Sequence, residues 1–136
     1  MKRPLIHFFI LFTLLTIVSS NSKAQSSAEF KKLIARTWKV NFYQLNGEKL
    51  NVSQEQQEAK VIYNENNTMT MTQVTYIRRG VWKYDEAKKE LTVTYTEPTT
   101  TDLFQVKKIS ETEMILEIDD PNRGKITFNF LPVNSK

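Results

Sequence analysis

Apolar side chains recur at every second position in successive short segments, and this two-residue period constrains the fold more than any other feature of the chain. In the stretch RRGVWKYDEAKKELTVTYTEP, Trp82 and Tyr84 share one face of a first segment, and Leu91, Val93 and Tyr95 share one face of the next. Successive side chains of a β-strand point to opposite faces, so the alternation predicts strands with one apolar and one polar face. The charged connection between the two segments indicates a hairpin.

The same period predicts eight strands, most of them followed closely by turn-forming residues. Their predicted ranges are 38–45, 60–64, 68–74, 79–84, 90–96, 102–109, 113–119 and 124–131. Asn46 and Gly47 are typical of a tight hairpin turn. The clusters NENNT and DDPNRG predict two more turns. We interpret EPTTTD as a polar loop and NVSQEQQEAK as a loop or a marginal helical turn.

A single short helix is predicted ahead of the strands. Phe30, Leu33 and Ile34 fall at helical spacing, which predicts a helix from about Ala28 to Arg36. A serine at position 26 or 27 is suited to cap its first turn.

Short connections force neighbouring strands to run antiparallel, because a parallel crossover needs about a dozen residues or more. An up-and-down set of eight strands that closes on itself loses its exposed edges. Its interior is then nearly filled by side chains or holds one small ligand. We therefore expect an all-β, eight-stranded antiparallel up-and-down barrel preceded by a short helix. A sandwich of two sheets is the competing arrangement.

The first 24 residues have the order of a secretory signal peptide. A basic start is followed by an apolar run of 14 residues from Leu5 to Val18 and by a small, polar exit. The run is shorter than the roughly 20 residues that span a bilayer core, which favours cleavage over an uncleaved anchor. Ser22 and Ala24 suit the positions before a cut, so Gln25 is the predicted mature N-terminus. Residues 25–136 then form one domain that is secreted to the periplasm or the medium and has no stable membrane insertion.

Charge and composition argue against several function classes. The signal removes three of the 19 basic residues, which leaves 16 against 15 acidic ones and no basis for nucleic-acid binding. The chain has no cysteine, and its one histidine, His7, lies in the signal. Catalysis would thus have to proceed without thiol or imidazole, and no recognisable arrangement of other groups replaces them. We expect a protein that is not an enzyme and has no cofactor.

Three stretches carry a family resemblance: IARTWKVNFYQLNGEKL, NNTMTMTQVTYIRRGVWKYD, and ELTVTY followed by FQVKKISETEMILEI. Together they resemble the small secreted lipocalin-like proteins of Bacteroidetes-type bacteria, over about residues 34–130. In that group a Thr-Trp-Lys opening follows a short helix, and a Gly-x-Trp-x-Tyr-Asp hairpin lies in the middle of the chain. The resemblance implies a cup-shaped barrel that binds a small apolar molecule.

The predicted ligand-binding residues are large apolar side chains assigned to the inner face of the strands. They are Phe42, Met69, Met71, Trp82, Tyr84, Tyr95, Phe104, Met114 and Phe128. Aromatic rings and methionines suit a ligand cup, but they equally suit a filled core. The hydroxyl of Tyr84 or Tyr95 would orient the polar end of a ligand. Trp38 is assigned to closing one end of the barrel.

Two acidic clusters are weaker candidates. Asp119, Asp120 and Asn122 offer oxygen ligands for calcium, but a hairpin turn explains them better, so no metal site is expected. Glu111 and Glu113 resemble a pair of acids for sugar hydrolysis, yet they lie beside a turn, where nothing raises a pKa.

Arg78 and Arg79, with Lys83 nearby, form the densest positive cluster of the predicted domain. They would meet an anionic head group at the barrel mouth, or they would lie in solvent on an outer face. We favour the solvent-exposed interpretation.

Two function hypotheses follow. The first is a secreted, non-enzymatic, lipocalin-like protein that holds a small hydrophobic or amphipathic ligand inside its barrel. The second is a filled barrel that binds a protein partner at the cell envelope through its outer surface or loops. They differ in whether the interior is hollow.

Overall fold

The computed structural model describes residues 26–134. The predicted signal peptide, residues 1–24, and its cleavage site lie outside the described residues. Nine strands and two short helices make up the described part of the chain. In chain order they are α1 (Ser27–Ile34), β1 (Thr37–Leu45), β2 (Glu48–Leu50), α2 (Gln54–Glu58), β3 (Lys60–Tyr63), β4 (Thr68–Thr72), β5 (Ile77–Asp85), β6 (Glu90–Thr96), β7 (Thr99–Ile109), β8 (Met114–Asp120) and β9 (Gly124–Pro132).

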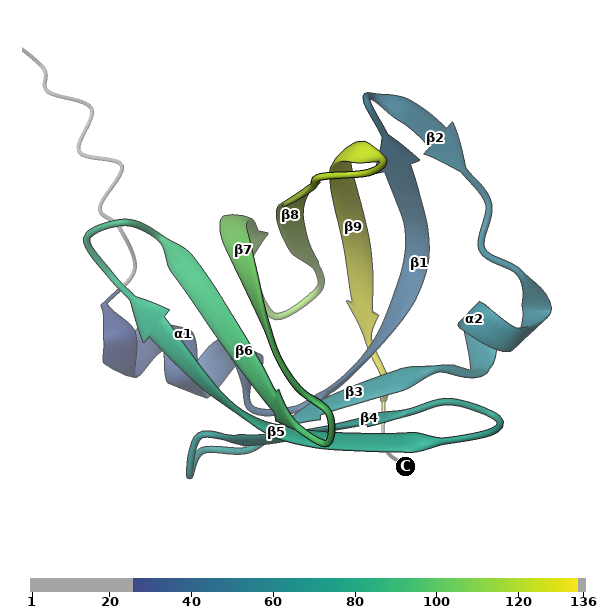
Figure 1. The fold of residues 1–136 in the computed structure, drawn as a ribbon. Helices are drawn as coiled ribbons and strands as arrows, with labels where there is room; N and C mark the ends of the chain where they lie inside the picture. Colours follow the sequence, from purple (N-terminus) through teal and green to yellow (C-terminus); the bar gives the residue numbers. More distant parts are fainter. Residues whose placement is uncertain (1–25, 135–136) are drawn as a thin grey trace, which may run out of the picture.

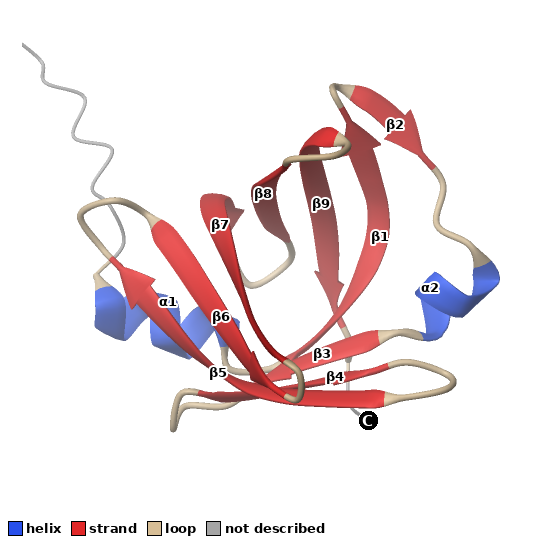
Figure 2. Ribbon diagram, viewed as in Figure 1, coloured by secondary structure: helices blue, strands red, loops and turns tan. Residues whose placement is uncertain are grey.

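The strands form one antiparallel sheet that closes into a barrel (Figures 1 and 2). Each strand from β3 to β9 pairs with the next along the chain, and β9 pairs with β1 over most of its length. Pairing of β1 with β3 completes the circle of eight strands. The predicted all-β, eight-stranded antiparallel barrel with a short helix before it is confirmed.

The contact between β1 and β3 is short, and this leaves one side of the wall incomplete. Only Thr37 and Trp38 of β1 pair with β3. Further along, the same edge of β1 pairs with β2 through a tight turn at Asn46 and Gly47, both of which have positive φ. The Asn-Gly turn predicted from the sequence is therefore confirmed, whereas the three-residue strand β2 was not predicted. Helix α2 lies beside the widening gap between β1 and β3 (Figure 1).

Helix α1 packs against the barrel near the end where β1 begins and β5 finishes. Ser26 caps its first turn, as one of the two predicted candidates, by accepting a hydrogen bond from the Glu29 amide at 3.2 Å. Phe30 and Ile34 are fully buried, and the Phe30 ring stacks on Tyr84 with centroids 3.8 Å apart. The Trp38 indole donates to the Ile34 carbonyl at 3.0 Å. Helix α1 and Trp38 together seal this end, which we call the closed end.

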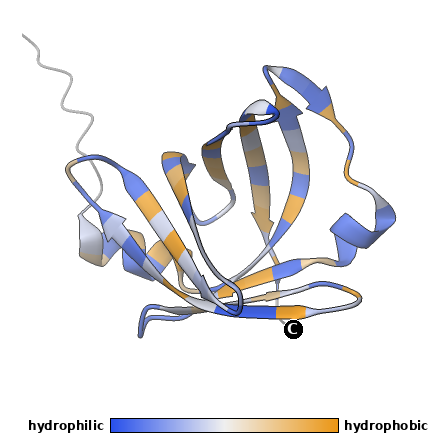
Figure 3. Cartoon of the chain, in the orientation of Figure 1, coloured by the Kyte–Doolittle hydropathy of each residue, from blue (hydrophilic) through white to orange (hydrophobic). Residues whose placement is uncertain are grey.

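Apolar and polar residues alternate along the strands as the two-residue period requires (Figure 3). Strand β6 follows it over its whole length, with Leu91, Val93 and Tyr95 buried and the intervening threonines partly exposed. The predicted range of this strand, 90–96, agrees with the structure.

The loop predicted for EPTTTD was wrong, whereas the helical alternative for NVSQEQQEAK is confirmed. Most of EPTTTD belongs to β7, which begins at Thr99 and leaves only a two-residue turn after β6. Threonines suit an exposed strand, and this β propensity outweighs their polarity. The segment after β2 contains α2, whose capping box pairs Ser53 with Gln56 in both directions. The Ser-x-x-Gln spacing is a sequence signal for such a helix start.

Candidate functional site

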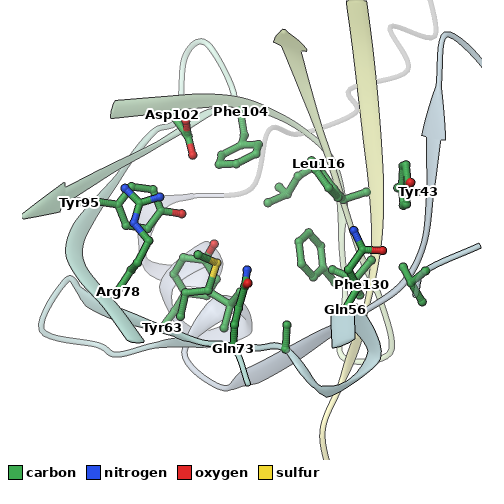
Figure 4. A pocket seen from close by; sticks show the side chains of 16 residues that line it. Tyr43, Gln56, Tyr63, Gln73, Arg78, Tyr95, Asp102, Phe104, Leu116 and Phe130 are labelled. Atoms are coloured by element: carbon green, nitrogen blue, oxygen red, sulfur yellow. The ribbon is translucent and has the colours of Figure 1, made fainter. Parts of the chain in front are cut away.

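A cavity of about 280 Å³ occupies the half of the barrel opposite the closed end (Figure 4). This volume is just below the range of about 300–1,000 Å³ that is usual for small-molecule sites. Its walls are mainly apolar, with a few polar side chains. The lining consists of Val40, Tyr43, Val52, Gln56, Ala59, Val61, Tyr63, Met71, Gln73, Arg78, Tyr95, Asp102, Phe104, Leu116, Phe128 and Phe130. Gln56 is exposed to solvent, so the cavity reaches the surface beside α2.

Four of the nine predicted ligand-binding residues line this cavity. Met71 comes from β4, Tyr95 from β6, Phe104 from β7 and Phe128 from β9. The rings of Phe104 and Phe128 meet edge to face, with centroids 6.4 Å apart. Strands far apart in the sequence therefore contribute to one aromatic wall.

Four other predicted residues fill the closed half. Met69, Trp82 and Met114 are almost completely buried and belong to the packed core. Tyr84 is covered by Phe30 of α1, so its hydroxyl does not face the cavity as one of our predictions required. The interior thus has a filled half and a hollow half. The prediction of a packed core holds for the filled half, and the lining of a ligand cup is possible only in the hollow half.

Phe42 does not line the cavity because the alternation of β1 is interrupted. The pairing of β1 with β9 shifts by one residue between Val40 and Phe42. This β-bulge leaves Asn41 without a partner in the ladder and reverses the face of every later residue. Val40 and Tyr43 consequently line the cavity, whereas Phe42 lies under the Lys49 ammonium, 4.4 Å from the ring centroid.

The segment between β2 and β3 contributes to the lining, although the sequence suggested no role for it. Val52, Gln56 and Ala59 lie where β1 and β3 separate. Their side chains replace the missing part of the barrel wall. Nothing in the two-residue period points to them, since they lie outside the strands.

Arg78 is the main correction to the sequence interpretation, because its side chain lies inside the barrel and not on a solvated outer face. Its guanidinium lies against the Tyr95 ring (Figure 4), with the guanidinium carbon 3.7 Å from the ring centroid. Its Nη2 donates to the Thr100 hydroxyl at 2.7 Å. Arg79 and Lys83 are exposed, as expected. Arg78 and Trp82 are an even number of residues apart in one strand, so strand alternation places them on the same inward face. The sequence interpretation instead gave more weight to the charge of Arg78 and assigned it to solvent.

One donor of the Arg78 guanidinium has no partner. The Nε–H group is buried and donates to no hydrogen-bond acceptor among the described residues. Asp102 lines the same side of the cavity, yet it forms no ion pair with Arg78 in the described part of the chain. Burial raises the pKa of Asp102, and the positive charge of Arg78 partly offsets this rise.

Two tyrosine hydroxyls add to the polar side of the cavity. Burial raises the pKa of Tyr95 to about 12, with a further rise from Asp102 and a reduction from Arg78. Burial also raises the pKa of Tyr63 strongly. Both hydroxyls therefore stay protonated at neutral pH and serve as hydrogen-bond donors or acceptors.

The acidic clusters form turns. Asp120 accepts hydrogen bonds from the amides of Asn122 and Arg123, at 2.8 and 3.0 Å, which confirms the predicted hairpin turn between β8 and β9. Glu113 binds Lys108 and the side-chain amide of Asn129. These hydrogen bonds lower its pKa, which is the wrong direction for a general acid. Within residues 26–134, no group of three or more His, Cys, Asp or Glu side chains is placed to hold a metal ion.

None of the helices in the described part of the chain is long and apolar enough to cross a membrane. A scan against models of known protein families gives no match, and a search of curated proteins finds no significant relative. The geometry of the barrel and its cavity therefore carries the functional argument.

Proposed function

We propose that the chain is a secreted, non-enzymatic, lipocalin-like protein that holds a small hydrophobic or amphipathic molecule inside its barrel. The observation that supports this proposal best is the cavity of about 280 Å³, which has apolar walls and reaches the surface at one end. A ligand there would gain about 25 cal/mol for each Å² of apolar surface that it buries. The signal-like N-terminus and the family resemblance support secretion and the lipocalin-like assignment.

The size of the cavity limits the ligand. A water molecule occupies about 30 Å³ in the liquid, so a volume of about 280 Å³ suits a molecule on the order of ten non-hydrogen atoms. 1-Octanol, with an eight-carbon chain and one hydroxyl, is a probe of this size. Its hydroxyl would bind at the polar side, next to Tyr95.

The alternative, a filled barrel that acts through its outer surface, receives less support. The cavity leaves one half of the interior unfilled. Among the large hydrophobic residues exposed on the outer faces, Val81 on β5 and Leu103 on β7 are separated by the partly exposed threonines of β6. Single apolar residues on a surface are normal and do not indicate a partner. The other exposed ones, Val74, Tyr76 and Ile77, lie together only at the short connection from β4 to β5.

Matched valine substitutions test the interior site. Val61→Phe places a ring in the cavity lining, whereas Val81→Phe makes the same change on the outer face, where Val81 is 51% exposed. Calorimetric titration with 1-octanol should give binding for the unchanged protein and Val81→Phe, and a loss of about tenfold or more for Val61→Phe. Equal binding by both variants would contradict an interior site.

A further inference from the structure

The polar side of the cavity contains a charged group whose hydrogen-bonding capacity is not used up. We define the polar corner as Arg78, Tyr95, Thr100 and Asp102. Strands β5, β6 and β7 bring these residues together, since Tyr95 pairs with Thr100 and also with Gly80, two residues after Arg78. The corner therefore lies where three neighbouring strands reach the hollow half.

Within this corner, the guanidinium of Arg78 is held in a fixed orientation. The Tyr95 ring stacks against it at 3.7 Å, and Thr100 accepts one of its N–H groups at 2.7 Å. An arginine carries five N–H donors in a rigid plane. Stacking and one hydrogen bond thus fix the plane while leaving donors available, which is the arrangement that suits recognition of a planar anion.

The unpartnered Nε of Arg78 shows that the corner is incomplete without a further acceptor. A buried polar group without a partner is unfavourable, and charged groups are affected most. The acceptor is not supplied by Asp102, because these two side chains form no ion pair within the described residues. Gln73 and Gln56 also line the cavity, but neither bonds to Arg78.

We propose that the polar corner recognises the carboxylate head group of an amphiphile whose apolar chain fills the rest of the cavity. This inference rests on the proposed function and names its ligand class. A carboxylate is planar and offers two acceptor oxygens, which match the N–H groups at the edge of a guanidinium. The negative charge of Asp102 already offsets part of the positive charge of Arg78, so an anion with one negative charge suits the corner better than a phosphate monoester with two.

The apolar part of the cavity agrees with a short chain. Phe104 and Leu116 lie across from Arg78 (Figure 4), and Phe128 lines the same cavity. Octanoate has an eight-carbon chain and one carboxylate, and therefore about the ten non-hydrogen atoms that the volume admits. Octanoate, 1-octanol and octylamine each have eight carbons in a row, and their head groups are a carboxylate, a hydroxyl and an ammonium, respectively.

Calorimetric titration of these three probes, with protein expressed from the full-length chain, tests the inference. The unchanged protein should bind octanoate about tenfold more tightly than 1-octanol. Arg78→Met should weaken octanoate about 10- to 100-fold and weaken 1-octanol by a clearly smaller factor, so that the preference for octanoate is lost. Arg79→Met is the matched control, since Arg79 is exposed on the outer face, and it should change neither affinity.

Two more variants separate charge from geometry. Arg78→Lys keeps the positive charge but loses the planar donors and the stacking on Tyr95, so it should recover only part of the octanoate affinity. Asp102→Asn removes the competing negative charge and should tighten octanoate. If Arg78→Met does not fold, the comparison of octanoate with 1-octanol on the unchanged protein and on Arg78→Lys decides the question.

The outcomes distinguish this inference from the proposed function. If 1-octanol binds as tightly as octanoate, or if Arg78→Met binds octanoate like the unchanged protein, the carboxylate inference is overturned and the binding function stands. If octylamine binds best and Asp102→Asn abolishes its binding, Asp102 is the recognition group and the inference is also wrong. If none of the three probes binds, both the inference and the proposed function fail.

Discussion

Replacing Phe30 by alanine should destabilise the barrel strongly, because Phe30 is the larger of the two fully buried side chains that join α1 to the closed end. Phe30 is fully buried, stacks on Tyr84 at 3.8 Å, and lies at a tilt to Trp82 with centroids 6.1 Å apart. Truncation of a buried phenylalanine costs about 3–5 kcal/mol, and a favourable aromatic pair accounts for about 0.5–1.5 kcal/mol of such a loss. Phe30→Ala should therefore lower the free energy of unfolding by about 3–5 kcal/mol. Phe30→Leu retains most of the apolar volume and should lower it by only about 1–1.5 kcal/mol.

Urea unfolding followed by tryptophan fluorescence measures both effects, since Trp82 lies beside the substituted ring. Lys32→Ala is the control, because Lys32 is exposed on the same helix, and it should change the free energy of unfolding by less than about 0.5 kcal/mol. If Phe30→Ala lowers this free energy by less than about 1 kcal/mol, α1 does not seal the barrel, and the division into a closed and a hollow half is wrong.

Three further predictions concern other parts of the chain. Gly80→Ala should lower the free energy of unfolding by about 1–3 kcal/mol in the same urea assay, because a Cβ there would overlap the Thr94 carbonyl oxygen of β6; an unchanged midpoint would contradict this close approach. Burial gives Asp102 a pKa above its usual 3.8, so the folded protein holds this proton more tightly than the unfolded chain, and the ionised carboxylate is destabilising above that pKa. Asp102→Asn should therefore be more stable than the unchanged protein at about pH 7, with a difference that shrinks as the pH falls from the raised pKa toward 3.8 and is lost below 3.8, and lower stability of the variant at neutral pH would refute this sign. Intact-mass and N-terminal analysis of the exported protein should show cleavage after Ala24 and a chain that begins at Gln25, and retention of residues 1–24 would instead support the anchor.

The sequence allowed the barrel to be predicted because local and global preferences agree in most strands. In β6 the alternation, the β-branched threonines and the short connection to β5 all favour one antiparallel strand. The Asn-Gly pair after β1 likewise specifies its turn through two positive φ angles. Closure then follows from eight such strands joined in order.

The cavity lining was harder to predict, because it depends on departures from regular alternation. The bulge at Asn41 exchanges the faces of Phe42 and Tyr43. No glycine or other residue typical of a bulge marks this position in the sequence of β1. The gap between β1 and β3 depends on how the whole barrel closes, which local sequence patterns do not show. Because of this gap, Val52 and Ala59 complete the barrel wall.

The polar corner was detectable in part. Arg78 has the same parity as Gly80, Trp82 and Tyr84, and Asp102 has the same parity as Phe104, so strand register alone directs both charged side chains inward. Charge made the solvated interpretation of Arg78 appear preferable, since arginine is seldom buried without a partner. The sequence does not reveal that Arg78 stacks on Tyr95, a contact that stabilises its inward position.

The methionine methyl groups provide the most direct test of a hollow half that takes up a ligand. Met71 lines the cavity, whereas Met69 and Met114 are buried in the filled half at 2% and 0% exposure. In a carbon-13 methyl-labelled protein titrated with 1-octanol, the NMR signal of Met71 should shift progressively and saturate, while the signals of Met69 and Met114 stay nearly constant. A Met71 signal that does not respond, or three signals that shift equally, would contradict an interior binding site.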